Sequence, residues 1–291
     1  MEILVTGGTG FVGSHLCNEL ADRGHAVTAL ARTPDGESLA DEVDTAVGDV
    51  TAYDSIEEAF EGQDSIVNLV ALSPLFKPKG GDQAHFEVHL GGTENVVRAA
   101  EAHGIDRIVQ MSALGADPSG PTAYIRAKGQ AETVVRESAL DWVVVRPSVI
   151  FGERGEFVSF TKKLTPPGIA GLPGGGKTKF QPIWIRDLVP ILADSVEADA
   201  HIGESYEIGG PETLTLKQVA KLVRGRVAVI PIPMAVAGFG LTIAGSIPGF
   251  PMGRDQYRSL KFDNTTDDNA VAAFGVDQIE LQTLSDYLKE Y

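Results

Sequence analysis

Three residues in the middle of the chain have the types and the spacing needed to transfer a proton at a carbonyl group. Tyr124 and Lys128 are four positions apart within residues 123–136, which have the period of a helix, so both side chains lie on one helix face. A neighbouring ammonium group is expected to lower the pKa of a phenol by about 1–3 units. Ser112 ends a strand predicted over residues 107–112 and could hydrogen-bond a substrate carbonyl oxygen. The alternative is a tyrosine and a lysine on a solvated helix face.

A glycine-rich turn at the start of the chain could hold a ligand for these groups. Residues 3–5 are an apolar run of strand type, and Gly7, Gly10 and Gly13 then open a helical pattern. Glycine allows a tight turn, close approach of the backbone to a pyrophosphate, and close contact between helix and strand. The first gap is wider than in the usual dinucleotide pattern, but the turn directly follows a strand and precedes another at residues 25–31. The sequence therefore predicts dinucleotide binding, and a glycine-rich turn without a ligand is the alternative.

The residues after the second predicted strand indicate which dinucleotide binds. An acidic residue about 20 positions beyond the glycines would bind the ribose 2′-hydroxyl of NAD. Residues 30–34 contain no acidic side chain, and the guanidinium of Arg32 could pair with a 2′-phosphate. NADP(H) is therefore favoured, with NAD(H) as the second choice. A solvated arginine at a strand end is the alternative reading of Arg32.

Several motifs resemble one known family. The run Thr6-Gly-Gly-Thr-Gly-Phe-Val-Gly13 resembles the opening of extended and atypical short-chain dehydrogenase/reductases. Residues 111–117, taken with Tyr124-Ile-Arg-Ala-Lys128, most resemble the atypical branch that contains the 39-kDa-type accessory subunits of respiratory complex I and their prokaryotic homologues. The likeness is dense up to residue 152 and thins out by about residue 210.

The resemblance implies a fold and a domain organisation. The expected fold is α/β, a doubly wound parallel Rossmann sheet of about seven strands with a small carboxyl-terminal substrate lobe. Residues 1–155 would form the NAD(P)-binding domain and residues 156–291 the lobe, with residues 180–209 returning to the first domain.

The resemblance also implies where the cofactor lies and which groups act. Tyr124 would be the acid/base, Ser112 would orient the substrate, and Lys128 would hold the ribose and tune the phenol. Asp49 would accept a hydrogen bond from the adenine, although a turn aspartate is an equal alternative. The cofactor-binding set is Gly7, Gly10, Phe11, Val12, Gly13, Arg32, Asp49, Val50, Val70, Ala71 and Lys128.

One position departs from the family pattern. Many relatives carry an asparagine of the active-site tetrad where this chain has His89, which puts the usual proton-relay water in doubt. His89 either replaces that asparagine or is a structural helix residue. Two functions stay open: an NADP(H)-dependent oxidoreductase or epimerase-like enzyme acting on a lipophilic carbonyl or quinone-type substrate, and a non-catalytic NADPH-binding accessory protein.

Composition limits the partners. The chain has 291 residues, with 24 Lys and Arg against 40 Asp and Glu, a net charge of −16, so nucleic acid is not an expected partner and no basic patch stands out. We expect no metal site. A strand that begins at residue 2 leaves no room for a signal peptide and predicts a cytoplasmic protein.

Two carboxyl-terminal segments need separate interpretation. Residues 171–178 match the phosphate-loop pattern G-x-x-x-x-G-K-[ST], but a strand follows instead of a helix, so the segment is expected to border the substrate cleft rather than hydrolyse a nucleotide. Residues 227–252 are apolar and contain four prolines, and their longest proline-free stretch, residues 234–247, is too short to span a bilayer. They could be a lid, a patch for peripheral contact with a membrane or a respiratory complex, or core, and core is favoured.

The remaining periodicity predicts further elements. They are a buried strand over residues 64–71, a loop over 72–82, a helix over 85–103, a strand over 141–152, a strand over 180–185 that leads back to the sheet by 189, a strand near 205–208, a helix over 216–223 capped from 213–215, and a terminal helix over 279–291.

Overall fold

A seven-stranded parallel sheet forms the centre of the molecule. The computed structural model describes residues 1–34, 38–238 and 254–290. The strand order is β11-β6-β5-β4-β1-β2-β3, and every neighbouring pair is parallel. The strands are β1 (Glu2–Thr6), β2 (Ala26–Ala31), β3 (Val43–Val47), β4 (Ser65–Asn68), β5 (Arg107–Met111), β6 (Asp141–Pro147) and β11 (Ser205–Ile208). The predicted fold class is confirmed.

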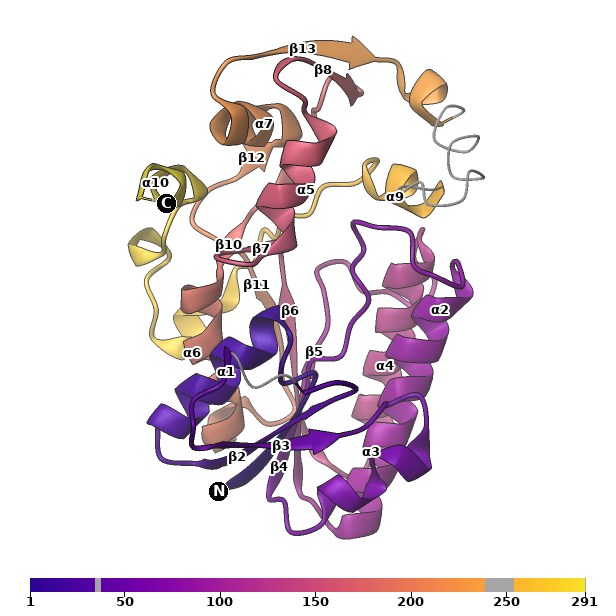
Figure 1. Ribbon diagram of the computed structural model, residues 1–291, viewed down its shortest axis with the longest axis vertical. Helices are drawn as coiled ribbons and strands as arrows, with labels where there is room; N and C mark the ends of the chain where they lie inside the picture. Colours follow the sequence, from indigo (N-terminus) through magenta and orange to yellow (C-terminus); the bar gives the residue numbers. More distant parts are fainter. Residues whose placement is uncertain (35–37, 239–253, 291) are drawn as a thin grey trace.

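Helices cover both faces of this sheet. Helices α1 (Phe11–Asp22) and α6 (Ile185–Glu197) lie on one face, and α3 (Gly92–His103) and α4 (Ala123–Glu137) lie on the other (Figure 1). Side chains alternate between faces along each strand, so Ile3 joins the α1–α6 core while Leu4 joins the α3–α4 core. This double burial explains why the central strands read as continuous apolar runs.

The order of the strands places a switch point beside β1. The chain runs outward from β1 to β2 and β3 on one side, then returns to build β4, β5, β6 and β11 on the other. The loops that follow β1 and β4 therefore diverge at one point on the carboxyl edge of the sheet, which is where open α/β sheets bind ligands.

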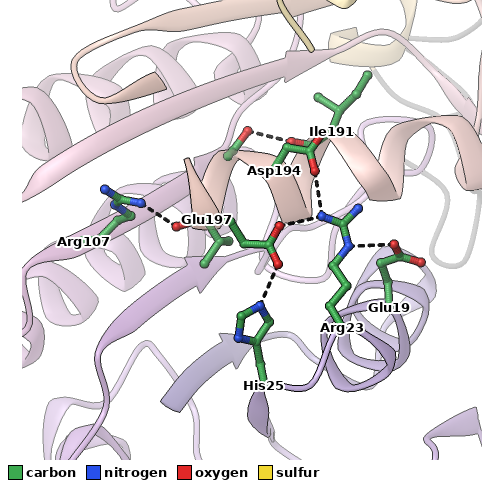
Figure 2. A network of polar contacts seen from close by, with 9 residues as sticks. Glu19, Arg23, His25, Arg107, Ile191, Asp194 and Glu197 are labelled. Atoms are coloured by element: carbon green, nitrogen blue, oxygen red, sulfur yellow. Dashed lines mark hydrogen bonds and ion pairs between the residues drawn. The ribbon is translucent and has the colours of Figure 1, made fainter. Parts of the chain in front are cut away.

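Ion pairs fasten α6 to the sheet. Arg23, at the end of α1, lies 2.6 Å from Asp194 and 2.7 Å from Glu197 of α6, and His25 lies 2.7 Å from Glu197 (Figure 2). From the edge of β5, Arg107 donates to the carbonyl oxygen of Val196 at 2.6 Å. Charge at this end of the molecule is used to join elements that are far apart in the sequence.

The remaining elements form a lobe beyond the carboxyl edge of the sheet (Figure 1). Its strands pair two by two: β7 (Ile150–Phe151) with β10 (Ile183–Trp184), β8 (Gly168–Pro173) with β13 (Val227–Ile232), and β9 (Lys179–Phe180) with β12 (Leu214–Thr215). Its helices are α5 (Glu156–Leu164), α7 (Leu216–Arg224), α9 (Arg254–Ser259) and α10 (Leu284–Glu290). Small separate cores hold it together, and the division of the chain at residue 155 stays a prediction.

Several predicted elements are confirmed with small changes. The helix over residues 123–136 is α4, and α7 is capped by Thr215, whose side chain and that of Gln218 form a capping box. The helix over residues 85–103 contains a π-helical turn: α2 (Gln83–His85) leads into η4 (Phe86–Gly91) and then α3. The loop over residues 72–82 is confirmed.

Two predictions at the carboxyl end are wrong in detail. The single strand over residues 180–185 is divided into β9 and β10 at Pro182, which has no N–H to donate to a ladder, and the chain then enters α6. The side chain of the preceding Gln181 donates to the carbonyl oxygen of Gly210 at 3.0 Å. The terminal helix begins only at Leu284, after a separate 3₁₀ turn capped by Asp277. The apolar stretch 227–252 is described only to residue 238, and its remainder lies outside the described residues.

Candidate functional site

The turn after β1 is built by glycine backbone. Gly7 has φ +76°, a left-handed conformation that glycine adopts without strain, and its N–H donates to the carbonyl oxygen of Leu30 at 2.8 Å. Gly10 closes the turn by donating to the carbonyl oxygen of Gly7 at 3.0 Å. A Cβ on Gly13 would lie 2.2 Å from that same carbonyl oxygen, so only glycine allows α1 to approach the turn this closely.

The amino end of α1 has the features of an anion site. Gly10 is its N-cap and supplies no side-chain hydrogen bond, so the first-turn amides, including those of Phe11 and Val12, have no side-chain acceptor at the cap. These amides and the positive end of the helix dipole suit a diphosphate. The residues present therefore fit the dinucleotide predicted from the sequence.

The edge formed by β2 and β3 carries the residues expected near the adenosine. Arg32 is exposed immediately after β2, and Val50 is buried against Gly92. The Asp49 carboxylate accepts from the Thr51 amide at 3.0 Å and from its hydroxyl at 2.8 Å, which is the turn arrangement given as the alternative. Burial tends to raise the pKa of Asp49, but these bonds and the charge of Arg32 lower it overall. The charges of Arg32 and Asp49 therefore attract each other at this edge of the sheet.

The loop after β4 lies between the glycine turn and His89. A Cβ on Gly7 would meet the Val70 amide nitrogen at 3.3 Å, so Val70 lies directly against the turn, and Ala71 is exposed beside it. The next amide, of Leu72, donates to Nε2 of His89 at 3.4 Å. Val70 and Ala71, which were predicted to contact the cofactor, thus lie between the glycine turn and His89.

Tyr124, Lys128 and Ser112 converge on the same edge. The Lys128 ammonium is buried and donates to the carbonyl oxygen of Met111 at 2.8 Å, one residue before Ser112. The Ser112 hydroxyl is buried with no hydrogen-bond partner among the described residues. A buried hydroxyl without a partner costs free energy unless a ligand supplies one, so Ser112 is suited to an incoming acceptor.

The expected effect of Lys128 on the phenol is not found in this state of the protein. Burial raises the pKa of Tyr124 above its usual value, whereas the sequence predicted a lowered pKa. The prediction was wrong because the phenol itself is buried, which disfavours its ionised form, and because the Lys128 ammonium donates to the Met111 carbonyl instead.

Two histidines complete the surroundings of Tyr124. The His85 and His89 rings are stacked with centroids 5.6 Å apart, and the edge of Tyr124 faces them at 5.6 Å and 5.3 Å. Burial lowers the pKa of both imidazoles, and the Lys128 charge contributes to both shifts, so both rings are neutral near pH 7. Nδ1 of each ring is buried without a partner among the described atoms.

His85 is a site residue that sequence reasoning missed. The sequence offered one indication of its role. His85 and His89 are four residues apart, as are Tyr124 and Lys128, so each pair shares a helix face, and in the structure these two faces meet. The ring of His89 lies beside that of Tyr124, with centroids 5.3 Å apart, and whether His89 replaces the asparagine stays a prediction.

The phosphate-loop pattern has the wrong surroundings for phosphate. Its first residues belong to β8, and the loop at Gly174–Gly176 is followed by β9 rather than by a helix. Carbonyl oxygens of the loop, those of Gly176 and Thr178, accept from the Lys217 and Leu216 amides at the start of α7 at 3.0 and 2.8 Å. The loop thus presents acceptors to a helix terminus, which is the opposite of a phosphate cradle.

The described ranges contain neither a metal-binding cluster nor a membrane-spanning helix. Within residues 1–34, 38–238 and 254–290, no three His, Cys, Asp or Glu side chains cluster closely enough to hold a metal ion. No helix in these ranges has both the length and the apolar character needed to cross a bilayer.

Comparison with known proteins identifies the class that this fold and site define. Residues 7–168 match a protein family described as NAD(P)H-binding. The chain belongs to this family, among the atypical short-chain dehydrogenase/reductases and epimerases.

Individual relatives share the whole fold at low identity. The chain is 28% identical to the mitochondrial NADH dehydrogenase (ubiquinone) 1 alpha subcomplex subunit 9 of Arabidopsis thaliana, over 92% of this chain and 71% of the relative. It is 29% identical to a 2-alkyl-3-oxoalkanoate reductase of Stenotrophomonas maltophilia, over 81% and 79%. A nucleoside-diphosphate-sugar epimerase of Staphylococcus aureus superposes with a TM-score of 0.76 at 19% identity, over 99% of this chain and all of that one, which shows the shared fold.

Proposed function

We propose that this protein is an NADP(H)-dependent oxidoreductase that reduces a carbonyl group, or runs the reverse reaction, with Tyr124 as the acid/base. One observation carries the proposal: a continuous series of contacts runs along the sheet edge from Gly7 through Val70 and Leu72 to His89, and from there to Tyr124. Lys128, one helical turn further, ends beside Ser112. A dinucleotide on the glycine turn would reach the phenol along this line.

The chain's own groups would divide the work as follows. The α1 amides, Gly7 and Gly10 would hold the diphosphate, and Arg32 would select the 2′-phosphate. Ser112 would donate to the substrate oxygen and orient the carbonyl. When bound, the nicotinamide supplies or accepts the hydride.

The proton step uses the phenol and its neighbours. As hydride adds to the carbonyl carbon, the C=O π electrons move to oxygen, and Tyr124 gives that oxygen its proton. The resulting phenolate would be stabilised by the Lys128 ammonium, which in the present structure is bonded to Met111. A neutral imidazole can reprotonate the phenolate only as a relay, by taking up a solvent proton at one nitrogen while it gives up the proton on the other. Nε2 of His89 accepts from the Leu72 amide, so His85 is the ring that we assign to this relay.

The substrate we favour is a lipophilic carbonyl or quinone-type compound. The named reductase relative acts on a 2-alkyl-3-oxoalkanoate, which supports a carbonyl substrate with an apolar chain. The proposed compartment is the cytoplasm. The buried Cys17 thiol, whose pKa burial raises to about 12, is compatible with that reducing environment.

A non-catalytic, NADPH-binding accessory role is the second candidate. The raised pKa of Tyr124 favours it, because a phenol that resists ionisation is a poor acid/base, and so does the likeness to a subunit of respiratory complex I. In that role the dinucleotide would stabilise the fold and the protein would turn over little.

Turnover of the Tyr124→Phe variant distinguishes the catalytic role from the accessory role. NADPH oxidation would be followed with a panel of ketones and quinones, and NADPH binding by nucleotide fluorescence. We expect the substitution to lower turnover by about 10²–10⁴-fold with NADPH affinity unchanged. Turnover that persists in the variant removes the acid/base role, and NADPH binding without turnover in either protein supports the accessory role.

A further inference from the structure

Charge is distributed unevenly between two parts of the chain. Residues 157–182 and 213–238 contain no Asp or Glu, and all 40 acidic residues lie elsewhere. The fold brings these two segments together in the lobe, as most of α5 and as β8, β9, α7 and β13 (Figure 1). Together their cations, here called the basic patch, were not evident from the sequence because the two halves are far apart along the chain; one acidic side chain from another segment, Asp263, accepts from the Lys179 amide at 2.8 Å. The members of the basic patch are Lys162, Lys163, Lys177, Lys179, Lys217, Lys221, Arg224 and Arg226.

These cations are not used to join elements by ion pairs. Among the described residues, none of the eight makes a salt bridge. All except Arg224 are exposed. Arg224 donates to the carbonyl oxygens of Thr165, at 2.7 Å, and Lys162, which fixes the end of α5 beside α7. Lys217 and Lys221 are one turn apart on α7 and share a helix face.

An exposed apolar face lies on the same lobe. In the β8–β13 pair, Ala170 and Leu172 of β8 and Val227 of β13 are buried. The alternate positions face outward, and Ile169 and Ile230 on them are 59% and 52% exposed. Val236, shortly after β13, is 61% exposed. Exposed β-branched side chains on a two-stranded ribbon are costly in water unless something covers them.

We propose that this end of the lobe docks on the surface of an anionic lipid bilayer. Ile169 and Ile230, on the face of the ribbon that points away from α7, would enter the headgroup region, while lysines of the same lobe extend their side chains towards it and place their ammonium groups on lipid phosphates. A nucleic acid would use the cations but would leave the isoleucines exposed. A bilayer uses both features of the surface, and the proposal is independent of the proposed catalytic function.

Vesicle sedimentation of the full chain, with no nucleotide present, tests this surface. The probes are vesicles of phosphatidylcholine alone and of phosphatidylcholine mixed with phosphatidylglycerol, at low and high salt. We expect binding to the anionic vesicles to be at least about tenfold stronger and to weaken with salt. The double variant Lys217→Glu/Lys221→Glu should lose at least about tenfold of that binding, because it reverses two surface charges.

Two further variants distinguish a lipid surface from other causes. Lys79→Glu/Arg98→Glu makes the same change in net charge on exposed residues outside the lobe and should change binding by less than about twofold. Ile230→Ser keeps every charge and should weaken binding about fivefold. Equal losses in the two double variants would trace binding to net charge and overturn the proposal. The proposal would also be overturned if the wild type showed no preference for anionic vesicles. If Ile230→Ser bound these vesicles as tightly as the wild type, the surface would be a generic polyanion site, which would overturn the proposal as well. Thermal melts confirm that each variant is folded.

Discussion

The sheet domain and the two acid-free segments of the lobe use charged side chains in opposite ways. In the sheet domain, Arg23 and Arg107 connect α1 and β5 to α6, and Arg146 on β6 binds the buried carboxylate of Glu132 on α4 through two nitrogens, at 2.9 and 2.6 Å. In the lobe, the eight cations on residues 157–182 and 213–238 have no acidic partner among the described residues.

This difference separates charges that hold the fold from charges that are available to a partner. A bidentate pair such as Arg146–Glu132 is satisfied within the molecule, and removing one member leaves a buried charge. An exposed lysine on α7 contributes little to folding and can be changed at little cost. The sheet domain should therefore be sensitive to substitutions that the lobe tolerates.

The largest difference is expected at glycines. In Gly13→Ala, the new Cβ would lie 2.2 Å from a backbone oxygen of the rigid turn, so we expect a loss of about 3 kcal/mol or more in unfolding free energy and loss of dinucleotide binding. In Gly171→Ala, the contact is with the flexible end of Ile232, and the loss should stay below about 1 kcal/mol. Urea denaturation measures both. Equal losses would show that the turn is no more constrained than the lobe ribbon.

Buried Lys128 should differ from exposed Lys221 in its response to pH. The folded pKa of Lys128 is about 8, below the unfolded value, so the cost of burying its charge is complete below pH 8 and declines as pH rises. We expect the unfolding free energy of the wild type to gain about 2 kcal/mol relative to Lys128→Met between pH 8 and pH 10. Lys221→Met should show no such trend. Parallel curves for wild type and Lys128→Met would contradict the buried charge.

Arg32 is the cation of the sheet domain that we assign to a ligand. It is exposed, and within the described ranges it forms no salt bridge. Arg32→Ala should weaken NADPH binding about tenfold, because a charge-assisted contact to the 2′-phosphate is lost, and should change NADH binding by less than about twofold. Calorimetric titration of both nucleotides is the measurement. Equal weakening for both would remove Arg32 from the 2′-phosphate site.

The smallest difference is expected between Arg23→Met and Lys221→Met. Arg23 reaches three carboxylates, those of Glu19, Asp194 and Glu197 (Figure 2), and its loss should lower the unfolding free energy by about 1 kcal/mol. Lys221→Met should stay within about 0.5 kcal/mol of the wild type. A cost at Lys221 as large as that at Arg23 would show that the lobe cations also stabilise the fold.

Local patterns predicted most of the fold. The sheet, the glycine turn, α4 and α7 follow from apolar runs, glycine spacing and capping residues, all of which act over a few neighbouring positions. The division of residues 180–185 had a local signal in Pro182, but the partner that holds Gln181, the carbonyl oxygen of Gly210, lies 29 positions away and could not be predicted in this way. The basic patch was missed for the same reason.

The candidate site was predicted in its members but not in its electrostatics. Ser112, Tyr124 and Lys128 converge as their spacing indicated. The pKa of Tyr124 depends on burial by other elements, including the ring of His85, and spacing along one helix carries no information about that burial. The assigned roles of the cofactor-binding residues stay predictions.

The wide π-helical turn η4 sets the direction in which His85 and His89 point. A turn of this type carries one residue more than an α-helical turn, and such turns are frequently found at functional sites. Removing one residue from Phe86–Gly91 would let the segment close as an ordinary α-helical turn, and it would change the spacing between the two histidines or between them and α3. The two stacked imidazoles would then no longer both face the phenol of Tyr124. A related protein with one residue fewer in this turn should therefore lack the function of the histidine pair, even if it keeps both histidines.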